Sequence, residues 1–516
     1  YAPSRLKKTH NTRDEQLWTD HQSRYLHTNI SKADKDKLMI TPLVLDLEKG
    51  QKLCFAEADI CDYPGMYLEQ TGKDDDITLN AVFAAYPTKI EIGGHGNIEK
   101  LVKDRADYIA ATEGTRTFPW RTMIVTEDAG GLIETDMVFR LARECQIEDI
   151  SWIKSGKTTW DWWNNSALFN VDFKAGFNTD TYKYFIDFAS QYGLEYILID
   201  EGWFDTQTTD IFQLSPELDL KEIIRYADTK HIGVLLWAGY LSFERELEKA
   251  VSHYAEMGIK GFKIDFFNRD DQLMIDAMWK FARICADHKL VVDFHGCSKP
   301  WGIQRTYPNV LNYEAVFGLE QMRWSKKDVD MVTHDVILPY TRMVAGPMDY
   351  TPGIFEQNLK EWAGNDSHVN STICGQLGLY LTMYSPLQMA ADTPEHYSEH
   401  LDAFKFIEDV AIDWSESRYL FAEPQEYVII ARKSKADGRW FCGGVTDGQA
   451  REFDIPLDYL GEGNYIATIF ADAPDADCYT NEKAYTISDV NVSSSDTIHV
   501  RMAPGGGFAI SFRKVD

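Results

Sequence analysis

Long apolar runs, paired cysteines and an excess of basic residues are all missing from this sequence of 516 residues. No stretch reaches the roughly 18 consecutive apolar residues of a membrane-spanning helix, so no membrane span is predicted. The eight cysteines form no CxxC pair and no His/Cys spacing of the kind that zinc needs. With 52 basic against 81 acidic residues the formal charge is −29, which disfavours a nucleic-acid partner. What is present, 44 % hydrophobic and 26 % charged residues, is typical of a soluble protein with more than one domain.

The spacing of apolar residues divides the chain into three regions. Residues 1–150 carry short alternating runs such as MITPLVLDL and WRTMIVTE, which predict an N-terminal β-sandwich domain and linker. In residues 151–416, short apolar runs alternate with amphipathic segments of helix length, a pattern typical of buried parallel strands in repeated βα units. Alternation returns in residues 417–516 and predicts a smaller C-terminal β-sandwich.

Eight βα units can be counted in the central region. The fold class predicted is therefore α/β, a (β/α)8 TIM barrel flanked by the two β-sandwiches. The expected strands are KTTWDWW (157–163), EYILIDEGW (195–203), GVLLWAGY (233–240), GFKIDFF (261–267), LVVDFHG (290–296), VLNYEAV (310–316), the region of LPYTRMVAG (338–346) and YSPLQMAAD (384–392).

Carboxylates and aromatic rings stand at the carboxyl ends of these strands, where such a barrel places its chemistry. Along the chain they are Asp161, Trp163, Asp200, Glu201, Trp237, Lys263, Asp265, Asp293, His295, Glu314 and, in the loop beyond, Glu320. Rings stack on the faces of a pyranose and carboxylates bind its hydroxyls, so the set predicts a sugar-binding mouth. Alone, Asp265 could be a helix cap and each tryptophan a core residue. The clustering of the whole set at the ends of six strands favours a site.

Glycoside hydrolysis needs two carboxyl groups in different protonation states, and the pair favoured here is Asp265 with Glu320. Lys263 lies two residues before Asp265, on the same face of the strand. It can keep a carboxylate ionised and bind a sugar hydroxyl. A structural ion pair is the alternative role for Lys263.

Three longer stretches of the central region carry a resemblance: GFKIDFFNRDDQ, VVDFHGCSKPWGIQRTYPNVLNYEAVFGLE and LPYTRMVAGPMDYTPG. They resemble glycoside hydrolase family 97, and WDWWNN and DEGW upstream are similar to that family as well. The resemblance implies an N-terminal β-super-sandwich, a catalytic barrel, a C-terminal β domain and a calcium ion beside the catalytic residues. About 150 residues precede the barrel where the family usually has a longer domain, so the N-terminal sandwich is expected to be truncated.

The family contains inverting α-glucosidases and retaining α-galactosidases, and two positions separate the branches. Inverting members carry a glutamate base at the end of the fifth strand, where DFHGCSKP has Gly296 after His295. Retaining members use an aspartate nucleophile at the end of the fourth strand, which matches Asp265 in KIDFF. By the same resemblance, Glu320 matches the acid/base residue.

The resemblance also implies the ligands of Ca²⁺. They are Glu314, Glu320 and Glu57, the last in FAEADICDYPGMYL. A carboxylate-rich mouth suits an ion that takes about 6–8 oxygen ligands. A solvated loop acid is the alternative role for Glu57.

The expected function is a retaining exo-glycoside hydrolase that releases terminal α-D-galactose, or the related β-L-arabinopyranose, by calcium-dependent double displacement. The alternatives are an inverting α-glucosidase-like hydrolase, which Gly296 disfavours, and a non-catalytic carbohydrate-binding protein, which has no need of Asp265 and Glu320 in those roles. The expected partner is an oligosaccharide or another glycoside. The resemblance further implies export to the periplasm, and a chain that starts at Tyr1 without Met agrees with a removed signal.

Overall fold

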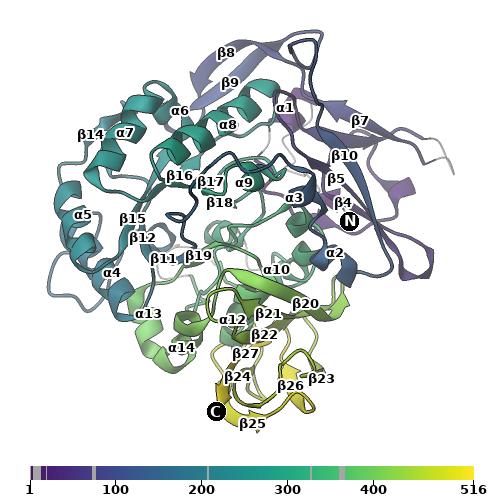
Figure 1. Ribbon diagram of the computed structural model, residues 1–516, viewed down its shortest axis with the longest axis vertical. Helices are drawn as coiled ribbons and strands as arrows, with labels where there is room; N and C mark the ends of the chain where they lie inside the picture. Colours follow the sequence, from purple (N-terminus) through teal and green to yellow (C-terminus); the bar gives the residue numbers. More distant parts are fainter. Residues whose placement is uncertain are drawn as a thin grey trace.

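The computed structural model describes residues 2–3, 13–18, 20–72, 77–205, 208–325, 328–359 and 367–515. A parallel barrel stands at the centre, and β-rich regions from the two ends of the chain pack against it on different sides (Figure 1). This arrangement confirms the predicted fold class. Across those ranges, no helix combines the length and the apolar character that crossing a bilayer requires.

Within the described residues, the barrel has seven parallel strands in the order β18-β17-β16-β15-β12-β11-β19. Their bounds are β11 Gly156–Trp160, β12 Tyr196–Ile199, β15 Gly233–Gly239, β16 Gly261–Asp265, β17 Val291–Phe294, β18 Val310–Tyr313 and β19 Leu387–Ala390. Alternate residues face opposite sides, so Phe262 and Ile264 of β16 pack in the helix-layer core. Lys263 and Asp265 therefore share the face that is turned to the barrel interior.

Amphipathic helices cover the outside of the strands (Figure 1). The longer ones are α4 (Thr179–Gln191), α5 (Leu220–Thr229), α7 (Leu247–Met257), α8 (Gln272–Asp287) and α12 (Ile373–Thr382). Four of them begin at a side chain that accepts a hydrogen bond from a backbone N–H of the first turn: Asn178, Asp219, Asp271 and Thr372.

The strand predicted at 338–346 does not form, and two 3-10 helices, η6 (Leu338–Tyr340) and η7 (Arg342–Ala345), stand there instead. Pro339 has no N–H to give to a sheet, and the buried guanidinium of Arg342 uses carbonyl oxygens that a ladder would need. It donates to the backbone of Ala315 at 2.9 Å and of Glu314 at 3.1 Å. The prediction of a strand at 338–346 was therefore wrong.

A side chain spans the gap that this segment leaves between β18 and β19. Nδ2 of Asn312, on β18, donates to the backbone oxygen of Leu387 at 3.0 Å and to Oγ of Ser385 at 2.7 Å. The barrel is thus held closed at this point by an amide rather than by a strand ladder.

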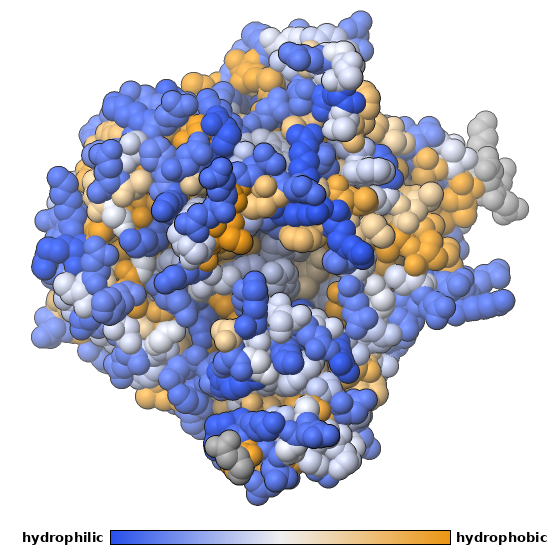
Figure 2. Space-filling model, viewed as in Figure 1, coloured by the Kyte–Doolittle hydropathy of each residue, from blue (hydrophilic) through white to orange (hydrophobic). Residues whose placement is uncertain are grey.

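The N-terminal region contains small antiparallel sheets in the orders β10-β5-β4, β3-β6-β7 and β8-β9. The strands are β3 Met39–Ile40, β4 Leu43–Asp46, β5 Lys52–Ala58, β6 Met66–Gln70, β7 Leu79–Phe83, β8 Pro87–Gly93, β9 Glu99–Arg105 and β10 Trp120–Thr126. Apolar side chains gather on the surface over β5 and β10 in Figure 2, where Met123 and Val125 are exposed. Two short helices, α2 (Gly130–Glu134) and α3 (Met137–Leu141), lead into the barrel.

The C-terminal region is a six-stranded sheet, β20-β21-β22-β27-β24-β25, beside the pair β23-β26. Its strands are β20 Trp414–Glu423, β21 Tyr427–Ser434, β22 Trp440–Thr446, β23 Arg451–Pro456, β24 Asn464–Asp472, β25 Tyr485–Val492, β26 Thr497–Met502 and β27 Gly507–Val515. Helix α12 of the barrel packs closely on β22, since a Cβ built at Gly378 would lie 2.6 Å from the backbone oxygen of Gly444. Only glycine allows the helix to approach this sheet so closely.

Candidate active site

The carboxyl ends of the barrel strands open into a cleft of ≈ 570 Å³. Seven of the residues predicted for the site line this cleft: Asp200, Glu201, Trp237, Lys263, Asp265, His295 and Glu320. They lie on or just after β12, β15, β16 and β17, and on the 3-10 helix η5 (Leu319–Arg323). The fold therefore brings together side chains that are far apart in the sequence.

Asp265 is the last residue of β16, and neighbours hold its carboxylate in place. Nε1 of Trp237 donates to Oδ2 at 3.0 Å, and the N–H of Phe266 donates to Oδ1 at 2.6 Å. Nδ1 of His295 lies 3.5 Å from Oδ2. The next helix, α8, is capped by Asp271 instead. Asp265 is therefore not a helix cap; its fixed carboxylate lines the cleft.

Three neighbouring strands end in the same way, with a polar side chain followed by a residue in the left-handed region. These following residues are Phe266 after Asp265 (φ 67°), Gly296 after His295 (φ 47°) and Ala315 after Glu314 (φ 41°). With a Cβ this conformation costs about 1–2 kcal/mol, and such strain gathers at functional sites. Each turn ends its strand abruptly and leaves the polar side chain at the mouth.

His295 connects the acidic groups of the mouth. Its Nδ1 lies 3.1 Å from Oε2 of Glu314, while its Nε2 lies 3.8 Å from Oε2 of Glu320 and 3.4 Å from Oδ2 of Asp349. Burial lowers the pKa of His295, but Glu314 and the other carboxylates outweigh burial and raise the pKa well above its ordinary value. The neighbouring carboxylates thus favour the protonated imidazole, which lies between Asp265 and Glu320.

The two central carboxyl groups differ in acidity. Burial raises the pKa of Asp265, but the adjacent His295, the charge of Lys263 and the bond from Trp237 outweigh burial and lower the pKa to about 2. Burial raises the pKa of Glu320, and the charge of Asp265 adds to the rise against the opposing effect of His295 and Lys263. Asp265 is thus held as an anion, while Glu320 favours its protonated form. A glycosidase pair needs these two different protonation states.

Lys263 lies in the floor of the cleft. Its Nζ is 3.0 Å from Oδ2 of Asp200 and 4.8 Å from the ring centre of Trp160, whose Nε1 donates to the same oxygen at 2.8 Å. The structural ion pair considered for Lys263 is therefore present. Lys263 still belongs to the site, because both Lys263 and its ion-pair partner Asp200 line the cleft.

Three side chains of the mouth form a group that could hold a metal ion. Ligand atoms of His295, Glu314 and Glu320 lie within 4.8 Å of one another. Gln22 from the N-terminal region reaches the same place, and its Nε2 donates to Oε2 of Glu314 at 2.6 Å. Carboxylate and amide oxygens in this set are the donors that a hard cation prefers.

Comparison with known proteins now identifies the family. Three family models match: Glycosyl-hydrolase 97 N-terminal over residues 4–143, Glycoside hydrolase 97 over residues 160–316, and Glycosyl-hydrolase 97 C-terminal, oligomerisation, over residues 413–513. A retaining alpha-galactosidase of Bacteroides thetaiotaomicron is 42 % identical over 506 residues, which are 97 % of this chain and 75 % of that protein. The chain belongs to glycoside hydrolase family 97.

Other relatives agree with this membership. A probable retaining alpha-galactosidase of Streptomyces bingchenggensis is 32 % identical over 408 residues, 78 % of this chain and 59 % of that protein. A family 97 enzyme from Pseudoalteromonas sp. strain K8, solved in complex with acarbose, matches 97 % of this chain and 78 % of its own with a TM-score of 0.85 at 28 % identity. The resemblance of the barrel motifs is confirmed, and the protein is a glycoside hydrolase.

Two residues predicted to bind sugar lie behind the wall of this family 97 cleft. Asp161 accepts hydrogen bonds from the hydroxyl of Tyr182 at 2.5 Å and from the N–H of Asp200 at 3.1 Å. Trp163 is fully buried in an apolar core. The 3-10 turn that begins at Trp162 is the reason, because it presents Trp162 to the cleft in place of the next ring. Asp161 therefore orients Asp200 from behind, and Trp163 supports the wall.

Glu57 is not brought to the group formed by His295, Glu314 and Glu320. Its Oε2 lies 2.8 Å from Nζ of Lys299 and its Oε1 lies 3.1 Å from a guanidinium nitrogen of Arg121. Both oxygens also accept from the N–H of Met66. With each oxygen engaged by positive groups, Glu57 fixes the seam between the N-terminal region and the barrel.

The N-terminal region of this family 97 chain also supplies part of the cleft wall, which reasoning from strand ends missed. His95 and Glu99, at the tip of the β8–β9 hairpin, line the cleft. Nε2 of His95 lies 3.4 Å from Oε2 of Glu201, and Nδ2 of Asn268 donates to Oε2 of Glu99 at 2.7 Å. No signal in the sequence marks these residues, because a hairpin tip that contacts another domain has the same polar sequence pattern as a tip exposed to solvent.

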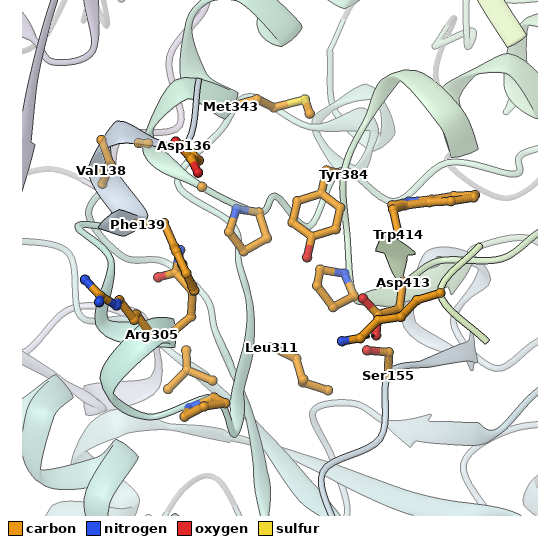
Figure 3. A pocket seen from close by; sticks show the side chains of 18 of the residues that line it. Asp136, Val138, Phe139, Ser155, Arg305, Leu311, Met343, Tyr384, Asp413 and Trp414 are labelled. Atoms are coloured by element: carbon orange, nitrogen blue, oxygen red, sulfur yellow. Dashed lines mark ion pairs between the residues drawn. The ribbon is translucent and has the colours of Figure 1, made fainter. Parts of the chain in front are cut away.

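A larger cavity of ≈ 630 Å³ lies at the other end of the barrel (Figure 3). It opens where strands begin, with Ser155 just before β11 and Leu311 on β18, and the face in Figure 2 is hollowed there between α3 and β20. Asp136 and Asp413 lie on opposite sides of it in Figure 3, and Asp413 is 3.2 Å from Nζ of Lys435. Carboxyl groups converge in the smaller cleft instead, so that cleft is the candidate active site.

Proposed function

We propose that this family 97 enzyme is a retaining exo-glycosidase that releases terminal α-D-galactose through Asp265 and Glu320. The observation that carries the proposal is the contact between Asp265 and Gly296. A Cβ built at Gly296 would fall inside van der Waals contact of Oδ1 of Asp265 and 2.8 Å from the backbone N of Phe266. Asp265 thus fills the space that a side chain at position 296 would need, so the base of an inverting enzyme has no room there.

The names of the relatives support the same choice. The proteins that are 42 % and 32 % identical carry the descriptions retaining alpha-galactosidase and probable retaining alpha-galactosidase. β-L-Arabinopyranose is α-D-galactopyranose without the C6 hydroxymethyl group, and it is the related sugar that the same pocket would accept.

The reaction proceeds by double displacement. Asp265 attacks C1 of the sugar while Glu320 gives its proton to the departing oxygen, so a glycosyl ester forms and the aglycone leaves as an alcohol. Glu320 then takes a proton from a water molecule, whose oxygen attacks C1 and breaks the ester. Two inversions at C1 give net retention. Both carboxyl groups lie against the same imidazole, His295, so one sugar can reach both.

The remaining residues of the cleft bind and orient the sugar. The ion pair of Lys263 and Asp200 presents a donor and an acceptor to hydroxyl groups in the floor, and Glu201 adds a further acceptor. Trp237 holds Asp265 through its N–H and offers an apolar ring face to the pyranose. His295 keeps Asp265 ionised in the resting enzyme.

A calcium ion is the cofactor that we assign to this site. Glu314 and Glu320 would hold it with their carboxylate oxygens, and Gln22, whose Nε2 donates to Glu314, would lie beside it. When bound, such an ion supplies fixed positive charge that positions Glu320 and the sugar oxygens. We also propose that the enzyme is periplasmic or otherwise exported, as its resemblance to exported family members implies.

The anomer that appears first decides between retention and inversion. Proton NMR of 4-nitrophenyl α-D-galactopyranoside during hydrolysis should show α-galactose before mutarotation mixes the two forms. If β-galactose appears first, the enzyme inverts and Asp265 is not the nucleophile. If no galactose is released but the β-L-arabinopyranoside is cleaved, the pocket is built for the sugar without C6.

The Asp265→Gly variant tests the nucleophile directly. It should lose turnover, and added azide should restore part of it by attacking C1 from the vacated side to give β-galactosyl azide. The matched control is Asp161→Asn, whose side chain lies behind the wall and leaves no space for azide at C1. Failure of azide to react in the Asp265→Gly protein would remove Asp265 from its role.

A further inference from the structure

We propose that the indole of Trp324 forms a subsite for a neutral sugar as the aglycone, so that the substrates are α-galactosyl oligosaccharides. The subsite rests on the proposed function, because it takes the Glu320 side of the cleft as the side of the leaving group. Glu320 must stand beside the departing oxygen in order to protonate it. The aglycone therefore lies next to helix η5, which carries Glu320.

Residues of the same short helix continue the cleft outward. Gln321 follows Glu320 directly, and Trp324 stands at the C-terminal end of η5; both line the cleft. The charged pair of Asp200 and Lys263 lies in the floor. The sugar that is released binds near this pair, and the space along Gln321 and Trp324 is left for the group attached to it.

Trp324 is exposed, yet its ring is fixed. The residue is 53 % exposed, while Nε1 donates to Oε1 of Gln321 at 3.2 Å. Its edge meets Trp162, with ring centres 5.5 Å apart and an angle of 88° between the planes. Trp162 is itself held between the ring of Trp160 at 5.6 Å and the guanidinium of Arg323 at 3.9 Å. A rigid aromatic ring at the mouth of a sugar cleft loses little entropy when a pyranose stacks on it.

The size and charge of the cleft define the aglycone further. A volume of ≈ 570 Å³ lies within the range of about 300–1,000 Å³ for sites that take drug-sized ligands, the size class of a disaccharide. With Glu320 carrying its proton, five carboxylates in the lining, those of Asp20, Glu99, Asp200, Glu201 and Asp265, outnumber the two buried basic side chains, Lys263 and His295. Such a field opposes uronic acids and sulfated sugars, so the aglycone sugar is neutral.

Two substrates that share galactose but differ in the aglycone test the subsite. For the wild type and variants, kcat/KM is measured with the galactosyl-α-1,6-glucose disaccharide and with methyl α-D-galactopyranoside. Trp324→Ala should lower the ratio of the two values, disaccharide over methyl glycoside, about tenfold, whereas Trp324→Phe keeps a ring and most of the ratio. The matched control is Trp120→Ala, an indole 54 % exposed on β10 outside the cleft, which should leave the ratio unchanged.

An equal loss for both substrates would mean that Trp324 only supports the fold, and no loss would mean that it binds no sugar; either result overturns the subsite. If the wild type cleaves neither α-galactoside, the proposed function fails instead. Calorimetric titration of the disaccharide into Glu320→Gln protein, with and without Trp324→Ala, then tests the subsite separately. Weaker binding by the double variant supports it, and equal or absent binding overturns it.

Discussion

The carboxylate of Asp265 lies against Gly296, so a methyl group added at position 296 tests whether catalysis depends on the position of this carboxylate. The methyl group of Gly296→Ala would meet Oδ1 of Asp265 and the backbone of Phe266. Asp265 would have to move by a large part of an ångström, and a displacement of about 1 Å can cost about 100-fold in rate. We expect kcat for 4-nitrophenyl α-D-galactopyranoside to fall at least that far, while the midpoint of thermal unfolding drops by only a few degrees.

The control is a glycine with the same backbone but free space around it. Gly193 has φ +69° with nothing within 4 Å of a built Cβ, so Gly193→Ala carries the left-handed cost of about 1–2 kcal/mol without a clash. Its stability should fall by the left-handed cost alone, no more than that of Gly296→Ala, and kcat should stay near that of the wild type. Equal loss of kcat in both variants would show that backbone strain, rather than contact with Asp265, is responsible.

Strand-end residues could be predicted from the sequence because a barrel fixes where its strands end. Asp265 and His295 follow directly from that rule, and both line the cleft. Trp163 lies outside the cleft because a 3-10 turn after the strand places the ring of Trp162 there instead. Trp324 and Gln22 could not be found, since neither stands at the end of a strand.

At the scale of elements, the closure of the barrel depends on one buried amide. Asn312 on β18 is fully buried, and its Nδ2 bonds across the gap to Ser385 and Leu387. Asn312→Ala removes both bonds and leaves a small cavity, so we expect a loss of about 1–3 kcal/mol in the free energy of unfolding, measured by urea titration. The control is Asn80→Ala, on the exposed face of β7, which should cost less than about 0.5 kcal/mol. An unchanged midpoint for Asn312→Ala would mean that other contacts hold the barrel closed.

The segment 338–346 shows that an apolar pattern can predict burial but not strand pairing. LPYTRMVAG reads as a buried strand because most of its residues are apolar, and they are indeed buried. Whether a buried segment pairs with a strand depends on its backbone partners. Arg342 takes up carbonyl oxygens of Glu314 and Ala315, just beyond the end of β18, and periodicity carries no information about such a bond.

At the scale of the whole molecule, periodicity predicted three regions but not how they meet. The N-terminal region sends Gln22, His95 and Glu99 into the cleft, and Glu57 stays at the seam with Lys299. These contacts form only when the N-terminal region packs on the barrel. The apolar periodicity of each region describes that region alone, so it does not predict them. The whole site is therefore a product of the assembled chain.

The seam between the barrel and the C-terminal region contains a buried acid, Asp472, at the end of β24. Its Oδ1 accepts from Oγ1 of Thr372, the cap of α12, at 2.6 Å. Its Oδ2 accepts from the N–H groups of Ala503 and Gly507, each at 2.8 Å. Burial raises the pKa of Asp472 from 3.8 to about 6, although these donors oppose the rise. The folded protein therefore keeps a proton between these two pH values that the unfolded chain has released.

Because its folded pKa is the higher one, Asp472 contributes stability that is fully present below pH 3.8 and is lost as the pH rises through about 6, at about 1.4 kcal/mol per pH unit. Asp472→Asn removes this titration and keeps the bridge, because its amide oxygen can accept from both N–H groups while its NH₂ donates to Thr372. We expect the variant to unfold at a higher temperature than the wild type at pH 8, by the equivalent of about 1–3 kcal/mol, and the difference to vanish towards pH 4. Asp472→Ala leaves three donors unpaired and should be less stable throughout. If Asp472→Asn is as unstable as Asp472→Ala at pH 8, the ionised carboxylate holds the seam together and burial of its charge is not the dominant cost.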